Sequence, residues 1–297
     1  MPVISQPTLQ QPRRRVGRRE FDFDRELVVM AIVNRTPDSF HDRGRNFALD
    51  SAVAAALAAE GEGAGWVDIG GVPFSPDAEQ VGPQVERDRI VPVVEAVTAA
   101  SDVVVSVDTW RSGVAAAAIA AGAAVINDTS GMHDPDLAPL VADSDATLVL
   151  THSLAEPGVH LRSPRYDDVV DEVRADLAAK IERALAAGIP AERLMIDPGP
   201  DLNKNTLHTL ELVRRFGEIA SLGLPSLVAL SNKDFVGEIL DRPRAEREIG
   251  SAVAASWCLA AGGRVLRVHD VRAGVDTVNM SASLLGWRAP ATLRHNI

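Results

Sequence analysis

The chain has 297 residues, of which 46% are hydrophobic and 24% charged, a composition typical of a globular protein with a large core. Its net charge of −11 disfavours general binding to nucleic acid or anionic membranes. A single cysteine, Cys258, excludes an internal disulfide and a zinc site built from several thiolates. No apolar run approaches the length of a transmembrane helix, and we expect a cytoplasmic protein.

The first 20 residues contain proline, glutamine and five arginines, but not the apolar segment of a secretory signal. This composition predicts a disordered basic tail over residues 1–20, although the arginine cluster also suits an acidic partner. Residues 21–297 are expected to form a single domain, because no low-complexity insert or linker interrupts them.

From Leu27 onward one unit recurs, in which a short β-branched run is followed by a polar residue, a loop and an Ala/Leu-rich helical stretch. Continuous apolar strands that alternate with helices indicate a parallel sheet buried on both faces. Eight such units fit a closed (β/α)₈ TIM barrel better than an open doubly wound sheet. The expected strands are 27–33, 66–69, 103–107, 124–126, 147–150, 193–196, 226–230 and 264–268.

Polar side chains follow the expected strands, where an α/β barrel carries its active site. Taken singly, each of these residues is explained as well by the start of a loop or by a helix cap. Their occurrence at all the strand ends favours a polar mouth. The residues are Asn34, Asp68, Asp108, Asn127-Asp128, Thr151-His152, Asp197, Ser231-Asn232-Lys233 and His269-Asp270.

Two kinds of ligand group are expected at this mouth. Asp108, Asn127 and Asp197, with Lys233 alongside, suit a flat, nitrogen-rich heterocycle, because carboxylates accept from ring N–H and amino groups. Arg267 and His269 suit a phosphate or pyrophosphate. The alternative for this second pair is an internal ion pair with the neighbouring Asp270.

The first strand ends at Asn34, whose amide oxygen suits a hard cation such as Mg²⁺ held together with phosphate oxygens and water. The double glycine of DIGG (68–71) suggests a loop in which the backbone closely approaches a ligand or turns at positive φ.

The motifs together resemble those of the dihydropteroate synthase family, over residues 27–287. They are MAIVNRTPDSF, DIGG, VSVDT, INDTSG, SPRYDDV, IDPG, LSNKDFVG and RVHDV, in strand order. The resemblance implies a pterin-binding (β/α)₈ fold. It also implies a reaction in which the amine of p-aminobenzoate displaces diphosphate from a dihydropterin-methylene diphosphate.

The resemblance carries residue roles with it. It implies pterin contacts from Asp108, Asn127, Asp197 and Lys233, a Mg²⁺ contact from Asn34, and diphosphate contacts from Arg267 and His269. In an active enzyme Lys233, Arg267 and His269 would be the catalytic set. The implied partners are p-aminobenzoate or sulfonamide-like analogues, and a second copy in a homodimer formed through the later helices.

The mouth loops depart from the family pattern. In the second loop Phe74 and Ser75 stand where the family has Thr and Arg. In the seventh loop Asn232 replaces an Arg and Asp234 replaces a Ser. The sixth loop, 200–204, reads PDLNK where the family has Gly-Phe-Gly-Lys. Because a lost charge-assisted hydrogen bond typically costs about a hundredfold in rate, the pattern predicts a pterin site with little or no synthase activity.

Other functions remain open on the sequence. Arg35, Arg43 or Arg45 of the first loop would restore a working synthase if they replaced the lost arginines. A non-catalytic ligand-binding or regulatory protein is a further alternative. Methyl transfer from a methyl-folate is disfavoured by the near-complete set of synthase motifs.

Overall fold

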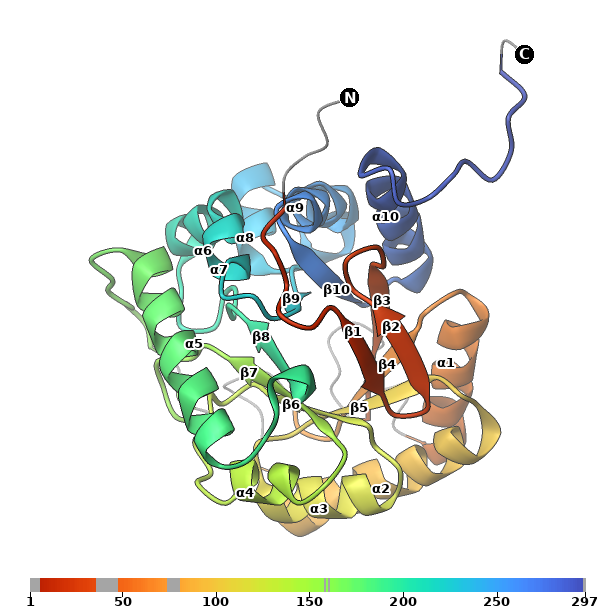
Figure 1. The fold of residues 1–297 in the computed structure, drawn as a ribbon, viewed down its shortest axis with the longest axis vertical. Helices are drawn as coiled ribbons and strands as arrows, with labels where there is room; N and C mark the ends of the chain where they lie inside the picture. The colour runs from red at the N-terminus through yellow and green to blue at the C-terminus, as the bar shows by residue number, and fades with distance from the viewer. Residues whose placement is uncertain (1–5, 36–47, 74–80, 158, 160, 296–297) are drawn as a thin grey trace.

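Parallel strands form a closed barrel at the centre of the molecule (Figure 1). The structure is a computed structural model and describes residues 6–35, 48–73, 81–157, 159 and 161–295. Within these residues eight strands close the barrel in the order β10-β3-β4-β5-β6-β7-β8-β9, which confirms the expected fold. They are β3 (Val28–Asn34), β4 (Trp66–Gly70), β5 (Val104–Asp108), β6 (Val125–Asp128), β7 (Thr147–Thr151), β8 (Leu194–Asp197), β9 (Ser226–Val228) and β10 (Gly263–Val268).

Helices surround the barrel as an outer ring (Figure 1). No helix in the described ranges is long and apolar enough to cross a membrane. The helices are α1 (Leu49–Gly61), α2 (Pro83–Ala100), α3 (Ser112–Ala120), α4 (Leu137–Ala142), α5 (Val169–Ala186), α6 (Thr206–Arg214), α7 (Phe216–Ala220), α8 (Asp234–Leu240), α9 (Glu248–Ala260) and α10 (Val271–Leu284), with 3₁₀ turns η1 (Ala191–Arg193) and η2 (Arg244–Glu246).

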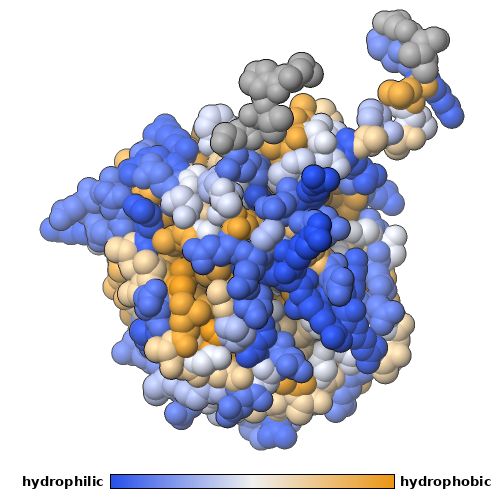
Figure 2. Space-filling model, viewed as in Figure 1, coloured by the Kyte–Doolittle hydropathy of each residue, from blue (hydrophilic) through white to orange (hydrophobic). Residues whose placement is uncertain are grey.

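A β-hairpin of β1 (Arg13–Val16) and β2 (Arg19–Asp22) lies across one end of the barrel, and its outer face is largely hydrophilic (Figures 1 and 2). The prediction of a disordered tail over 1–20 is therefore wrong for its described part, residues 6–20. The reason is that one arginine is buried: Arg14 donates hydrogen bonds to the carbonyls of Gln10, Gln11, Glu192 and Leu194.

The barrel interior is filled in layers, which explains why the polar groups gather at the opposite end. Next to the hairpin the inward side chains are apolar and pack against Phe21 and Phe23; they include Met30, Trp66, Val104, Val149, Met195 and Val265. Because alternate residues of a strand face the same side, the next inward positions on β4, β5 and β10 are Asp68, Ser106 and Arg267. An apolar plug thus lies beneath a polar layer.

The buried Arg14 provides a test of the hairpin's anchoring. Arg14→Ala leaves backbone carbonyls without their donor, and we expect the free energy of unfolding to fall by about 2–3 kcal/mol in urea titration. Arg15→Ala is the matched control, because Arg15 is exposed, and it is expected to change stability by less than about 0.5 kcal/mol. Equal effects of the two substitutions would contradict the anchoring role.

Candidate ligand-binding site at the barrel mouth

A buried carboxylate, Asp68, organises the floor of the mouth. It accepts hydrogen bonds from Ser106 Oγ at 2.6 Å, Asn127 Nδ2 at 3.0 Å and Arg267 Nε at 2.7 Å. Arg267 Nη2 also donates to Asp108 Oδ2 at 3.2 Å. Side chains from four strands are therefore tied to one another, and they hold the floor in one arrangement before any ligand binds.

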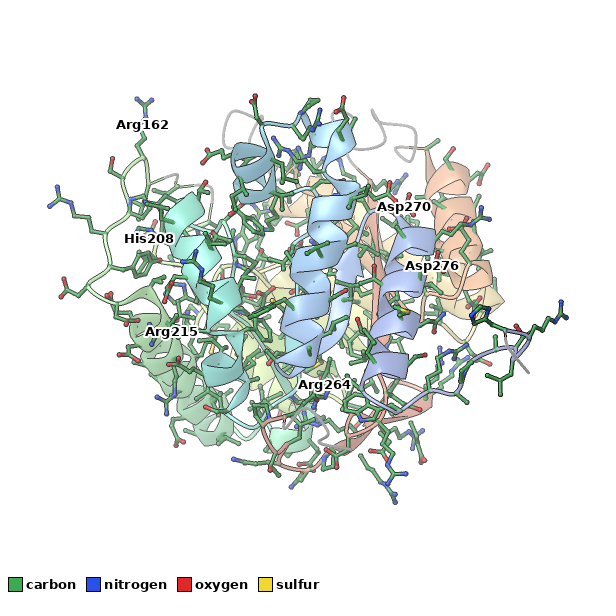
Figure 3. All side chains as sticks on the ribbon, turned by 90° about the horizontal axis from the view of Figure 1, so that it is seen from above. Arg162, His208, Arg215, Arg264, Asp270 and Asp276 are labelled. Atoms are coloured by element: carbon green, nitrogen blue, oxygen red, sulfur yellow. The ribbon has the colours of Figure 1, made fainter. Side chains whose placement is uncertain are left out.

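Arg267 is held by Asp68 and Asp108, so the alternative of an internal pair with Asp270 does not describe it. Asp270 instead caps α10, where its side chain accepts from the Ala273 N–H, at the mouth end of that helix (Figure 3). His269 Nδ1 lies 3.0 Å from Ser231 Oγ.

Burial makes the ionised form of Asp108 unfavourable in this floor. Burial raises the pKa of Asp108 to about 7; Arg267 opposes this rise and the neighbouring Asp68 adds to it. Close by, the Asn127 side-chain oxygen is buried with no hydrogen-bond partner among the described residues. A buried polar atom without a partner is uncommon in folded proteins, and here it leaves an acceptor available for a ligand N–H.

Strand β8 ends at Asp197, at the same end of the barrel, and a glycine shapes the turn that follows it. Asp197 Oδ1 accepts from the Gly199 N–H at 2.7 Å, while burial raises the pKa of the Asp197 carboxyl. Gly199 has φ +62°, and a Cβ added to it would lie 2.1 Å from the carbonyl oxygen of His152. Only glycine fits there.

Lys204 is a buried residue of the mouth whose importance sequence reasoning missed. Its ammonium contacts His152 Nδ1 at 2.8 Å and donates to the carbonyls of Gly199 at 2.9 Å and Leu202 at 3.0 Å. Burial lowers the pKa of Lys204 to about 7 and that of His152 to about 2, so His152 is neutral and acts as the acceptor. These contacts hold the sixth loop against His152, the residue that follows β7. In the sequence, only the match of Lys204 to the lysine of the family pattern pointed to this residue.

The glycine positions of the sixth loop are occupied by residues that keep a glycine-like backbone. Counting back from Lys204, Asp201 and Asn203 stand at the two glycines of Gly-Phe-Gly-Lys, with φ of 63° and 52°. Asp and Asn are the residues that best tolerate left-handed geometry besides glycine. The loop therefore retains its path although its chemistry has changed.

The seventh loop brings Lys233 to the sixth loop and places its neighbour Asn232 at a separate cavity. Lys233 Nζ donates to the carbonyl of Pro200 at 2.6 Å. Asn232 has φ 58°, its N–H donates to Ser251 Oγ, and the residue is among those that line a cavity of about 420 Å³ between α9 and α10. That cavity contains none of the predicted pterin contacts.

The two glycines of DIGG allow neighbouring side chains to pack closely against the backbone. A Cβ on Gly70 would lie 3.0 Å from Asn34 Oδ1, so Gly70 makes room for the predicted metal contact. A Cβ on Gly71 would lie 3.0 Å from the Ile90 side chain on α2, and the Gly71 carbonyl accepts from Arg89. Phe74 and Ser75 lie outside the described residues.

Arg35, a candidate replacement for the lost loop arginines, is held by helix α2. Its Nη1 donates to the carbonyls of Asp88 at 3.1 Å and Arg89 at 2.5 Å. Pro92 stands inside α2 and has no N–H to offer the Asp88 carbonyl four residues earlier, which Arg35 supplies instead. The other candidates, Arg43 and Arg45, lie outside the described residues.

Removing the floor's arginine tests the electrostatic description. In Arg267→Met the pKa of Asp108 is expected to rise further, because its stabilising cation is lost. A carboxyl with a raised folded-state pKa contributes stability at low pH that disappears as pH rises through that pKa. We therefore expect a destabilisation of about 3 kcal/mol at pH 8 and a smaller one at pH 5.5, measured by urea titration.

The control is the double variant Arg267→Met/Asp108→Asn, which has no carboxyl at position 108. Its stability difference from Asp108→Asn should depend less on pH than the difference that Arg267→Met makes in the parent. An Arg267→Met penalty that is independent of pH would contradict the assignment.

Comparison with known proteins agrees with this geometry. A family model described as "Pterin binding enzyme" matches residues 30–269. "Inactive dihydropteroate synthase 2" of Mycobacterium leprae is 44% identical over 273 residues, 90% of this chain and 93% of the relative. "Dihydropteroate synthase" of the same organism is 41% identical over 267 residues, 87% and 94% of the two chains.

Solved structures agree as well. Yersinia pestis dihydropteroate synthase in a sulfonamide complex superposes with a TM-score of 0.87 at 35% identity, covering 93% of this chain and 100% of that one. The Xanthomonas albilineans enzyme with 4-aminobenzoic acid superposes with a TM-score of 0.85 at 38% identity, covering 92% and 98%. The chain therefore belongs to the pterin binding enzyme family and is a dihydropteroate-synthase-like protein.

Proposed function

We propose that the protein binds a pterin at the barrel mouth and has little or no dihydropteroate synthase activity. The observation that carries the proposal is the Asn127 side-chain oxygen, buried and unpartnered among the described residues. Asn127 pairs in register with Asp108 on the neighbouring strand, and Asp197 ends β8 at the same end of the barrel. Relatives that are 44% identical over 273 residues, 90% of this chain, are named inactive dihydropteroate synthase 2, which supports the second half of the proposal.

The floor suits the donor-rich edge of a pterin ring. Asp108 and Asp197 accept from ring N–H and amino groups, and Asn127 accepts one further N–H through its free oxygen. Arg267 holds Asp108 in place and lies at the same level of the barrel. The ring would thus be recognised by groups that are already positioned, which reduces the ordering cost of binding.

Fewer groups are available to hold a diphosphate than to hold the pterin ring. Mg²⁺ supplies charge neutralisation to a leaving diphosphate when it is bound. Asn34 fits this role as one hard oxygen ligand, since Mg²⁺ in such sites typically takes most of its ligands from phosphate and water. No group of three or more His, Cys, Asp or Glu suited to a metal occurs in the described ranges. Arg267 and His269 would contact the diphosphate.

Three features support weak activity. The seventh loop carries Asn232 and Asp234 where the family has Arg and Ser, and Asp234 pairs with Arg247 at 2.8 Å. The sixth loop adds Asp201. Arg35 is engaged by α2. A working synthase is the second candidate, favoured by the 41% identity to the Mycobacterium leprae dihydropteroate synthase, and complementation of a strain that lacks the synthase distinguishes the two.

Calorimetry and a turnover assay test the proposal together. We expect 6-hydroxymethyl-7,8-dihydropterin to bind the purified protein, and Asn127→Ala to weaken that binding by about tenfold to a hundredfold, because it removes one acceptor and breaks the bond to Asp68. Asp276→Asn, an exposed position on α10 (Figure 3), is the control and should bind as the parent does. Turnover of the diphosphate with p-aminobenzoate at an ordinary enzyme rate would refute the inactivity.

We further propose that two copies associate through α9 and α10, which pack side by side. Ile249, Val253 and Trp257 recur at four-residue spacing on α9 and are 79%, 67% and 60% exposed. Met280 and Leu284 extend this apolar surface on α10. Large exposed apolar side chains in one patch are typical of a protein–protein interface. A patch that pairs with its own copy gives a closed two-fold dimer.

A charge placed in this patch tests the dimer. Val253→Glu is expected to convert the protein from a dimer to a monomer in analytical ultracentrifugation, because a desolvated carboxylate without a partner opposes association. Val85→Glu is the control, since Val85 is an exposed valine on α2, away from the patch. A parent protein that sediments as a monomer would contradict the proposal.

A further inference from the structure

Asp201 fastens the sixth loop to two helices. Its Oδ1 accepts from Thr209 Oγ1 of α6 at 2.8 Å, and its own N–H donates back to that oxygen at 3.1 Å. Its Oδ2 accepts from the backbone N–H of Asp234, the first residue of α8, at 2.8 Å. One carboxylate thus joins the loops that follow β8 and β9.

Lys233, which precedes Asp234, also contacts the sixth loop. Lys233 Nζ donates to the carbonyl of Pro200, the residue before Asp201. Burial lowers the pKa of Lys233, and among the groups that oppose this effect Asp201 is the strongest, ahead of Asp197. Asp201, which stands at a family glycine position, therefore adds negative charge next to the Lys233 ammonium at the point where that ammonium contacts the sixth loop.

Two further cations of the mouth are paired with carboxylates, whereas Lys204 contacts His152 and backbone carbonyls. Arg267 is paired with Asp68 and Asp108, and Arg247 is paired with Asp234. An incoming anion must therefore compete with carboxylates already in place. A neutral heterocycle does not meet this repulsion, because its contacts are hydrogen bonds to oxygen acceptors.

We propose that Asp201 sets the charge selectivity of the mouth, so that the site takes an uncharged pterin in preference to a pterin diphosphate or another anion. The inference rests on the proposed function and deepens it by naming the class of ligand. Asp201 acts here as a specificity-determining residue, through Lys233 and the Pro200 carbonyl.

Two substitutions remove the charge without changing the backbone. Asp201→Asn keeps an oxygen for the Asp234 N–H and tolerates the left-handed conformation. Asp201→Gly restores the family residue and suits positive φ. The matched control is Asp241→Asn: Asp241 is exposed, has φ 52° and ends α8 at its far end, so the substitution changes the same charge at the same kind of backbone position.

The experiment is calorimetry with 6-hydroxymethyl-7,8-dihydropterin and its diphosphate, each with Mg²⁺ at pH 8. The parent is expected to bind the uncharged pterin about tenfold more tightly than the diphosphate. Both Asp201 variants should gain about tenfold in affinity for the diphosphate while their affinity for the uncharged pterin stays within about twofold. Asp241→Asn should change neither, and the gain should shrink at high salt.

A Lys233→Met background identifies the route. There the Asp201→Asn substitution should no longer improve diphosphate binding, because the cation that it releases is absent. An unchanged ratio of the two affinities in both Asp201 variants would overturn the inference alone. A gain that persists without Lys233 would overturn it as well. Failure of the parent to bind either compound would instead overturn the proposed function, and this inference with it.

Discussion

The geometry of the mouth depends on one buried carboxylate. Asp68 has no exposed side-chain surface, and it is sustained by donors from Ser106, Asn127 and Arg267 on three other strands. A charge in this position is costly unless it is paired and hydrogen-bonded. The barrel meets that requirement by closing, since closure brings β10 around to β3 and β4. The floor and the closed barrel are therefore a single structural unit.

In the loops above the floor, backbone geometry and side-chain chemistry differ in how far they match the family pattern. Lys204 still pins the sixth loop through His152, and Asp201 and Asn203 still occupy left-handed positions. The backbone path thus suits the family's glycines, while position 201 carries a negative charge in place of an uncharged glycine. Geometry and chemistry can diverge independently in a loop, because backbone conformation requires only that a residue tolerate the dihedral angles.

Much of this arrangement was predictable from the sequence. Strands and inward-facing ends such as Asp108, Asn127 and Asp197 follow from a two-residue period and the rule that barrel sites lie at the carboxyl ends of strands. The buried Arg14 and Lys204 were not predictable in this way. Arginine in a charged run is usually solvated, and Lys204 meets its partner His152 52 residues away in the chain, a pairing that only the folded barrel creates.

The proline in α2 has a consequence for how the first loop is able to evolve. Arg35 donates the hydrogen bond that Pro92 is unable to give to the Asp88 carbonyl, so two positions far apart in the chain are linked through one backbone acceptor. In a relative without the proline, the backbone N–H at position 92 would donate to the carbonyl at position 88. The arginine at position 35 would then no longer be needed for that hydrogen bond. Residues 35 and 92 should therefore change together among homologues. The residue at position 92 then indicates whether a first-loop arginine is engaged by α2 in a given member of the family.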